Sequence, residues 1–500
     1  MSEIIHWADV IAEDLISKNK KQRIATGISP SGPIHLGNLR EMVIADTIKR
    51  AVTEKGGEAE IVYIADTFDP LRKRYPFLPK SYEQYIGMPL SEIPDPEGCH
   101  ESYAEHFLLP FLKALDELEI DVEIKKADEM YKRGEYANEI KTALKKRQVI
   151  AKIIKEVTGR EVGDDWSPFM PLCKNCGKIS TTRVKKFDGK KVTYACKCGY
   201  EGENSLREGK LTWRVDWAAR WKILKITCEP FGKDHAAAGG SYDTGVRFAR
   251  EIFNYEPPYP VIYEWIHLKG VGAMKSSKGI VVPVSELVRA VPPEVIRYLI
   301  VRVKPEKHIE FDPRFGLLEI IDSFEDELKQ NSRNVQLSLT SKIEYSDVPF
   351  KHLVIVGQIA KWDLNSVLKI LSRRYLINEK VKKDVERRLP YAKAWIEKYA
   401  PEQLKFEIKD KIEVMLDNDE IKFLKAFASK LHKGLKADDI HTLVYTVSKD
   451  TSIKPSKAFR AIYKVILGKK EGPRAGYFIE SLGIEWVRNR ILSILEKHED

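Results

Sequence analysis

Residues 21–69 contain the pattern that most restricts the fold of this 500-residue chain. A short extended run at 23–26 is followed by the turn GISPSGPIHLGN at 27–38. Apolar residues then recur at helical spacing from Leu39 to Val52, until Gly56 and Gly57 end the pattern, and EIVYIADTFD at 60–69 is typical of a buried strand. This strand–helix–strand unit predicts an open parallel sheet with helices on both faces.

The turn at 27–38 is expected at the carboxyl end of the first strand, where parallel sheets bind ligands. Its glycines allow close approach to the backbone, and the first helical turn offers unpaired N–H groups to a phosphate. Neither G-x-G-x-x-G nor a P-loop lysine is present. On this stretch alone, a phosphate site and a tight turn in which His35 caps a helix are both open interpretations.

A second glycine-bounded segment, GAMKSSKG at 272–279, carries two lysines around two serines. Such a cationic loop suits a triphosphate whose charge builds during phosphoryl chemistry, although a solvated basic hairpin is the alternative. Between the two segments, KILKITC at 222–228 is expected to form a strand. Gly232, Asp234 and His235 follow it, and the acid could bind ribose hydroxyls.

Four of the six cysteines lie in one segment and predict a metal site rather than disulfides. Cys173 and Cys176 form C-x-x-C, and Cys196 and Cys198 follow as C-x-C, which favours a structural zinc ribbon over four free thiols. A mixed set, Asp95, Cys99, His100 and His106, offers a second zinc site. Its alternatives are coincidence and a buried Cys99 thiol.

Charge and hydropathy indicate a cytoplasmic protein. The N-terminus has acids where a secretory signal needs a basic start, and apolar runs are too short to cross a membrane. Lys and Arg exceed Asp and Glu by 84 to 74, which permits a polyanionic partner without establishing one. Beyond about residue 320, charged leucine-bearing stretches predict helices.

The motifs together resemble a known family. HLGN at 35–38 is similar to the first signature of class I aminoacyl-tRNA synthetases, usually His-Ile-Gly-His, and AMKSSKG at 273–279 to the second, usually Lys-Met-Ser-Lys-Ser. TGISPSGPIHLGN, ADTFDPLRKRYP at 65–76 and PPEVIRYLIVRVKP at 292–305 resemble the archaeal-type class I lysyl-tRNA synthetases. Asn38 replaces a histidine and Ala273 a lysine, so the leading lysine of the second motif is left open.

The resemblance implies lysyl-adenylate formation from ATP and transfer of lysine to tRNA(Lys), without a covalent nucleophile on the protein. Zinc is then structural, and Mg²⁺ accompanies ATP. A lysine ammonium needs carboxylates and aromatic faces, so Asp69, Trp213, Asp216 and Trp265 belong to the pool of possible lysine ligands. The expected site residues are His35, Asn38, Lys275 and Lys278 for catalysis; Ser29, Pro30, Gly37, Gly232, Asp234, Met274, Ser276 and Ser277 for ATP; and Gly27, Asp66, Trp217, His235 and Tyr263 for lysine.

The expected fold class is α/β. A Rossmann-like parallel-sheet catalytic domain, residues 1–285, contains insertions at about 80–205 that include a zinc ribbon at 170–200. A connecting region that contacts the tRNA stem, 286–325, and an all-α anticodon-binding region, 326–500, follow. The alternatives are a glutamyl-type class I synthetase, a small nucleotidyltransferase and a tRNA-binding protein with a decayed site. The oligomeric state is not legible.

Overall fold

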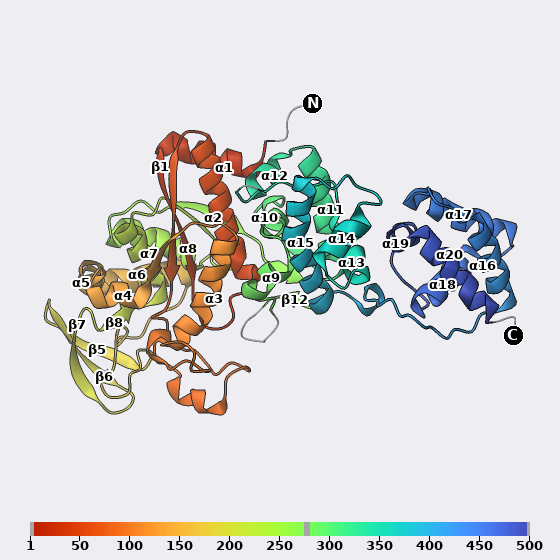
Figure 1. Ribbon diagram of the computed structural model, residues 1–500. Helices are drawn as coiled ribbons and strands as arrows, with labels where there is room; N and C mark the ends of the chain where they lie inside the picture. Colours follow the sequence, from red (N-terminus) through yellow and green to blue (C-terminus); the bar gives the residue numbers. More distant parts are fainter. Residues whose placement is uncertain (1–4, 275–280, 342, 498–500) are drawn as a thin grey trace. The chain divides into compact units, whose positions relative to one another are not determined.

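The computed structural model describes residues 5–274, 281–341 and 343–497. These form two compact units, and the chain passes between them several times. In Figure 1 the sheet strands carry the red to green colours of the first part of the chain. The segments of unit 1 are Met1–Val288, Ile296–Phe311 and Asn331–Thr340, and those of unit 2 are Arg289–Val295, Asp312–Gln330 and Ser341–Asp500.

Unit 1 is built on a five-stranded parallel sheet, as the βαβ pattern predicts. The strand order is β10-β9-β1-β2-β3, so the direction of strand addition reverses between β1 and β9. This is the Rossmann-like arrangement, whose ligand sites lie at such a reversal. The strands are β1 (Lys21–Ile28), β2 (Glu58–Ala65), β3 (Glu123–Lys126), β9 (Cys228–Gly232) and β10 (Tyr259–Tyr263).

Helices cover both faces of the sheet. One face packs β1 and β2 against α4–α8, in a core that includes Val62, Ile64 and Trp221. On the other face α2 packs on β1, β2 and β9 and contacts α1. The α-helices are α1 (Trp7–Lys18), α2 (Leu36–Glu54), α3 (Tyr103–Glu117), α4 (Ala127–Arg133), α5 (Ala137–Lys145), α6 (Arg147–Thr158), α7 (Trp213–Leu224), α8 (Ser241–Arg247) and α12 (Arg333–Ser338).

Short elements complete unit 1. A three-stranded sheet pairs β11 with both β12 and β13, and helices α9 and α10 cross the boundary between the units. Their bounds are η1 (Lys80–Tyr85), η2 (Leu90–Glu92), η3 (Phe248–Ile252), β11 (Ile266–Leu268), β12 (Gly272–Ala273), β13 (Ile309–Phe311), α9 (Val284–Ala290) and α10 (Pro293–Val301).

The cysteine-bearing insertion is a small β-structure between α6 and α7. Its two antiparallel sheets are β5-β6-β7 and the pair β4-β8. Pairing of β4 with β8 closes the base of the insertion directly before α7. The strands are β4 (Phe169–Pro171), β5 (Thr182–Phe187), β6 (Lys191–Cys196), β7 (Glu201–Ser205) and β8 (Gly209–Leu211).

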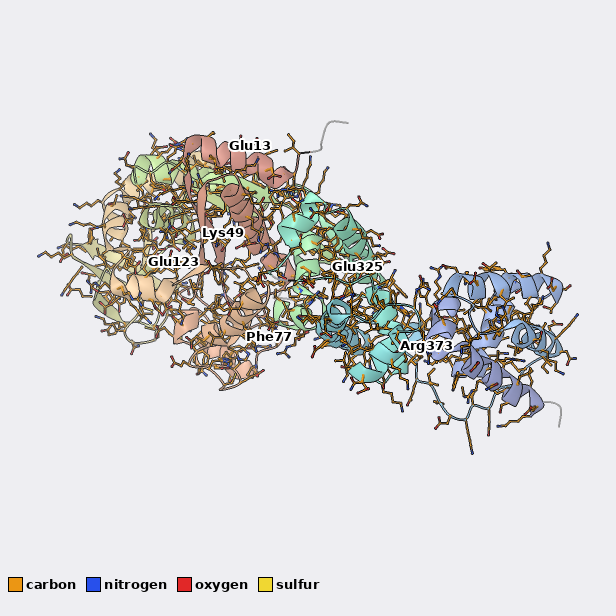
Figure 2. All side chains as sticks on the ribbon, turned by 45° about the horizontal axis from the view of Figure 1, so that its top comes forward. Glu13, Lys49, Phe77, Glu123, Glu325 and Arg373 are labelled. Carbon is orange, nitrogen blue, oxygen red and sulfur yellow. The ribbon has the colours of Figure 1, made fainter. Side chains whose placement is uncertain are left out.

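In its described residues, unit 2 contains helices and no strand, which confirms the all-α prediction for the C-terminal region. Glu325, labelled in Figure 2, joins three of them: its Oε1 accepts from the Phe350 amide and from Arg388, each at 2.9 Å. Helices α16–α20 enclose an apolar core on which Ile355 and Ile359 of α13 also pack. The helices are α11 (Phe315–Lys329), α13 (Phe350–Ile359), α14 (Leu364–Leu371), α15 (Glu379–Lys398), η5 (Glu402–Leu404), α16 (Asn418–Lys430), α17 (Ala437–Asp450), α18 (Pro455–Leu467), α19 (Ala475–Leu482) and α20 (Ile484–Glu496).

Two sequence predictions need correction. The strand expected at 222–228 is wrong, because residues 222–224 complete α7 and the strand begins only at Cys228. Lys225 ends the helix in a left-handed conformation, φ 54°, and redirects the chain into β9. Helix α2 begins at Leu36, earlier than the apolar periodicity indicates, because His35 caps it. No described helix is long and apolar enough to cross a membrane.

Candidate active site

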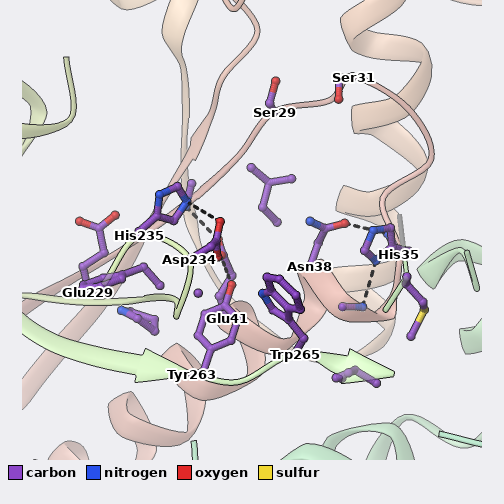
Figure 3. A pocket seen from close by; sticks show the side chains of 18 of the residues that line it. Ser29, Ser31, His35, Asn38, Glu41, Glu229, Asp234, His235, Tyr263 and Trp265 are labelled. Atoms are coloured by element: carbon purple, nitrogen blue, oxygen red, sulfur yellow. Dashed lines mark hydrogen bonds and ion pairs between the residues drawn. The ribbon is translucent and has the colours of Figure 1, made fainter. Parts of the chain in front are cut away.

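A cavity of about 410 Å³ lies beyond the carboxyl ends of β1 and β9, where the strand order reverses. All of its lining residues belong to unit 1. Figure 3 shows His35 and Glu229 on opposite sides of the view, with Glu41, Asp234 and Tyr263 between them. The lining residues are Gly27, Ile28, Ser29, Ser31, His35, Gly37, Asn38, Glu41, Trp213, Trp217, Arg220, Glu229, Pro230, Phe231, Gly232, Asp234, His235, Tyr263, Trp265, Ile266, Ala273 and Met274.

His35 is the N-cap of α2 and lines this cavity. Its Nδ1 accepts a hydrogen bond from the Gly37 amide at 3.1 Å. Burial lowers the pKa of the ring to about 4, so the imidazole is neutral near pH 7 and its proton is on Nε2. A Cβ on Gly37 would lie 2.9 Å from the His35 ring. The capping alternative is therefore true, and the same ring presents a donor beside the cavity.

The turn is fixed at two further points. Asn38 Oδ1 accepts from the His35 amide at 3.2 Å, which leaves the Asn38 NH₂ group as a donor. The Leu36 amide donates to Val282 O, and the Val284 amide to Ile34 O, each at 3.0 Å. The signature turn is thus bonded to the chain just after the second motif. Met274 lines the cavity, whereas Lys275, Ser276, Ser277 and Lys278 lie outside the described residues.

Glu41, on the second turn of α2, is a buried carboxylate in the wall of the cavity. Its Oε1 accepts from the Gly27 amide at 3.0 Å and its Oε2 from the Tyr263 hydroxyl at 2.7 Å. Burial raises the pKa of Glu41 to about 8. Within the described part of the chain it has no Lys or Arg ion-pair partner.

Glu229 of β9 is a second buried carboxylate in the same wall. Its Oε1 accepts from Trp217 Nε1 at 2.9 Å, and its Oε2 accepts from Trp221 Nε1. Burial raises the pKa of Glu229 to about 7. No described cation forms an ion pair with it either, so the cavity has two buried acids in need of a positive charge.

Asp66, expected among the lysine ligands, is instead committed to the protein and does not line the cavity. Arg220 donates to its two oxygens at 2.6 and 3.3 Å and also bonds Asp216 at 2.5 Å. Lys210 of β8 approaches Asp216 at 2.6 Å and Asp69 at 3.4 Å. These three aspartates and two cations form the buried ion network, in which Asp66 is paired with Arg220, and its role as a lysine ligand stays a prediction.

Aromatic rings form the wall next to Glu229. Trp213 and Trp217 stack with centroids 5.5 Å apart, and the His235 ring lies 5.4 Å from that of Trp217. Burial lowers the pKa of His235. His235 Nε2 is 3.7 Å from Asp234, whose side chain is 53% exposed. This wall offers apolar faces for a carbon chain and an accessible carboxylate at its rim.

The four cysteines of the insertion converge on one point, as their spacing predicts. The Sγ atoms of Cys176 and Cys196 are 3.6 Å apart, and those of Cys173 and Cys198 3.7 Å. Four sulfurs bound to one tetrahedral Zn²⁺ are about 3.8 Å apart, so the donor set fits zinc. All four are free thiols in the structure.

The mixed cluster also converges, because a turn at 95–101 leads into α3. Asp95 Oδ1 lies 3.0 Å from His106 Nδ1, and Cys99 Sγ lies 2.9 Å from His100 Nδ1. All four ligand atoms lie within 4.8 Å of one another. Cys99 is exposed, so the alternative of a buried thiol is wrong. Coincidence is disfavoured by this convergence.

Comparison with known proteins decides the family. A family model described as tRNA synthetases class I (K) matches residues 5–346, and one described as an anticodon binding domain matches 391–495. The chain belongs to the class I tRNA synthetases. This result confirms the resemblance read from the two signatures.

The synthetase is similar to several archaeal proteins over nearly its whole length. A lysine–tRNA ligase of Archaeoglobus fulgidus is 63% identical over 98% of this chain and all of that one. A lysine–tRNA ligase of Methanosarcina barkeri is 47% identical over 98% of each. A solved glutamate tRNA ligase from Elizabethkingia meningosepticum aligns over 95% of this chain and 99% of that one, with a TM-score of 0.44 and 11% identity.

Most described residues expected at the site of this synthetase line one cavity, but three charged residues of its lining were not predicted. Glu41, Glu229 and Arg220 carry no motif. Glu41 follows the first signature by one helical turn, which was the available signal. Glu229 lies in β9, which was predicted too early, at 222–228. Pro30, which was predicted to contact ATP, is buried and does not line the cavity.

Proposed function

We propose that this protein attaches L-lysine to tRNA(Lys). A carboxylate oxygen of lysine attacks the α-phosphorus of ATP, pyrophosphate leaves, and a ribose hydroxyl at the tRNA 3′ end then attacks the lysyl carbonyl and releases AMP. The observation that carries the proposal is the pair of buried acids, Glu41 and Glu229, in the cavity of a chain 63% identical to a lysine–tRNA ligase.

The phosphates of ATP are proposed to lie on the side of the cavity lined by His35 and Asn38. The neutral His35 ring and the Asn38 amide would donate to oxygens that gain charge as pyrophosphate departs. Ser29, Gly37, Gly232, Asp234 and Met274 remain proposed ATP contacts, as do Lys275, Ser276, Ser277 and Lys278 outside the described residues. Mg²⁺ bound with ATP would neutralise charge on the β- and γ-phosphates.

Lysine is proposed to lie at the other end, along the Trp217 and His235 rings. Glu41 would accept hydrogen bonds from an ammonium group, and the Gly27 amide and Tyr263 hydroxyl hold its carboxylate in place. The glutamyl alternative is disfavoured by the same feature, because two buried acids would repel the side-chain carboxylate of glutamate.

Two structural zinc ions are proposed outside the cavity. One would be held by Cys173, Cys176, Cys196 and Cys198, and the other by the cluster at 95–106, since each set of ligand atoms is within reach of one ion. The first zinc would crosslink the strands and turns of the insertion, and the second would crosslink the turn before α3. Free thiols fit a reducing cytoplasm, which we propose as the site of action.

The helical C-terminal region is proposed to read the anticodon of tRNA, in keeping with the family model matched at 391–495. The region 286–325 remains a prediction for the contact with the tRNA stem. Unpaired bases would stack on aromatic side chains, and lysines and arginines would contact phosphates.

Pyrophosphate exchange with each standard amino acid tests this function, with and without tRNA. Lysine is expected to drive exchange, and glutamate and arginine are not. Exchange driven by another amino acid would contradict the assignment, and no exchange under either condition would favour a tRNA-binding protein with a decayed site.

A further inference from the structure

The charges around the amino-acid end of the cavity do not balance within the described residues. Lys210 and Arg220 are both paired with aspartates of the buried ion network, so neither is left to pair with Glu41 or Glu229. Glu41 and Glu229 are left, both buried and both lining the cavity. A carboxylate taken out of water without a cation is costly, so this wall favours a ligand that supplies positive charge.

We infer that Glu229 binds one ammonium group of lysine while Glu41 binds the other, so that the cavity selects ligands with two ammonium groups. The inference rests on the proposed function. Lysine carries two ammonium groups near pH 7, and each acid can neutralise one. Figure 3 shows Glu229 at the left of the view and Glu41 nearer its centre, and both line the same cavity of about 410 Å³.

Each glutamate can accept a substrate ammonium without giving up a protein cation. Glu229 faces the indole N–H groups of Trp217 and Trp221. Arg220 is the nearby guanidinium that favours its ionised form, and Asp66 opposes it. The His235 ring lies tilted against that of Trp217, and burial lowers its pKa, which favours the neutral form. Both carboxylate oxygens retain acceptor capacity beyond the one indole bond that each receives.

Glu41 has comparable surroundings. It faces the Gly27 amide and the Tyr263 hydroxyl, and Arg40 lies over the Tyr263 ring, 5.9 Å from its centroid. Arg40 donates to backbone carbonyls, among them Lys307 O at 2.7 Å and Pro305 O at 3.1 Å. Glu229 and Asp66 act on Glu41 as like charges.

Binding of a ligand with two ammonium groups should release protons from Glu41 and Glu229. Burial raises the pKa values of Glu41 and Glu229 to about 8 and about 7, so near pH 7 the empty cavity holds one or both as neutral acids. A bound ammonium favours the carboxylate, and each proton lost by a glutamate passes to solvent. Lysine binding is therefore expected to weaken as the pH falls from 8 to 6.

A pair of amines tests charge selection on the unmodified protein. 1,5-Diaminopentane has both ammonium groups of lysine but no carboxylate, and pentylamine has one ammonium. The diamine should inhibit lysine-dependent exchange competitively. Its inhibition constant should be at least roughly 10-fold lower than that of pentylamine, because it makes one more charge-assisted hydrogen bond. Equal inhibition by the two amines would overturn the inference, while absence of lysine-dependent exchange would overturn the proposed function instead.

Calorimetry tests the role of Glu229. Lysine is titrated at pH 7 in two buffers of different ionisation heat, which gives the protons released. Glu229→Gln should lower that number and raise the KM for lysine roughly 30-fold or more, with the KM for ATP within about 2-fold. Glu256→Gln, which removes an exposed acid outside the cavity, is the control.

A well-folded Glu229→Gln variant with unchanged lysine KM and proton release would overturn the assignment. Thermal melting establishes whether the variant folds. If the variant does not fold, two measurements on the unmodified protein still test the inference. Absence of proton release on lysine binding, or absence of a preference for the diamine over pentylamine, would overturn it.

Discussion

At the residue scale, His35 combines a structural and a chemical role. Its Nδ1 caps α2 and its Nε2–H is the remaining donor. His35→Ala should lower the rate of adenylate formation by roughly 10²–10³, the effect of removing one preorganised donor, with little change in ATP affinity. Pre-steady-state adenylate formation measures this.

The matched control for this prediction is His35→Asn, which restores a cap acceptor without the ring donor. It should recover most of the roughly 1 kcal/mol of stability that the alanine loses, but not the rate. Recovery of the rate by asparagine would show that only the helix cap matters.

Glu41 gives the empty protein a pH-dependent stability. Its folded pKa, about 8, is above the unfolded value near 4.5, so the folded state binds a proton more tightly. Stability should therefore fall as the pH rises from about 5 to 8. Glu41→Gln should flatten the dependence of the melting temperature on pH over this range, and a parallel loss in both proteins would contradict the prediction.

At the element scale, β8 joins the cysteine-bearing insertion to the wall of the cavity. Lys210 lies on this strand, and its Nζ contacts Asp216 at the start of α7. Lys210→Met should destabilise the protein by roughly 3–5 kcal/mol, because it leaves three buried aspartates with Arg220 as their one remaining cation in the network. Urea unfolding measures this loss. Lys186→Met, at an exposed position on β5, should unfold like the unchanged protein.

The two metal clusters belong to separate elements, so their ions should be lost separately. Elemental analysis should find about two zinc ions per chain. Cys173→Ala should remove one and His106→Ala the other. Zinc that survives both substitutions would mean that neither cluster holds it.

At the scale of the whole molecule, the sequence predicted what depends on local pattern and pairwise spacing. The βαβ unit, the cysteine convergence and the helical C-terminal region are of this kind. The two cavity glutamates were not predicted. In the sequence, Glu41 is indistinguishable from any other polar residue of a helix. Glu229 meets the site only through the pairing of β9 with β1, 200 residues away in the chain. The commitment of Asp66 to Arg220 likewise depends on the fold.

Chain connectivity predicts which truncations fold. Unit 2 takes in residues 312–330, where α11 packs on α13, so a chain ending at residue 340 would leave the apolar face of α11 uncovered. Residues 1–340 should aggregate on expression. A chain ending at residue 404 keeps the packing of α11 on α13 and uncovers Ile355 and Ile359 of α13, so it should fold with lower stability, with lysine activation retained and tRNA charging lost. Light scattering and exchange assays compare the two.

The position of α12 late in the chain also has a consequence for synthesis on the ribosome. Arg333 of this helix pairs with Asp9 of α1 and Glu54 of α2, each at 2.7 Å. At about 5–20 residues per second, roughly 16–65 s separate translation of Asp9 from that of Arg333. During that interval Asp9 and Glu54 have been synthesised, but Arg333, with which they form ion pairs, has not. The N-terminal half therefore reaches its final fold at a time that depends on the rate of translation as well as on its own folding rate.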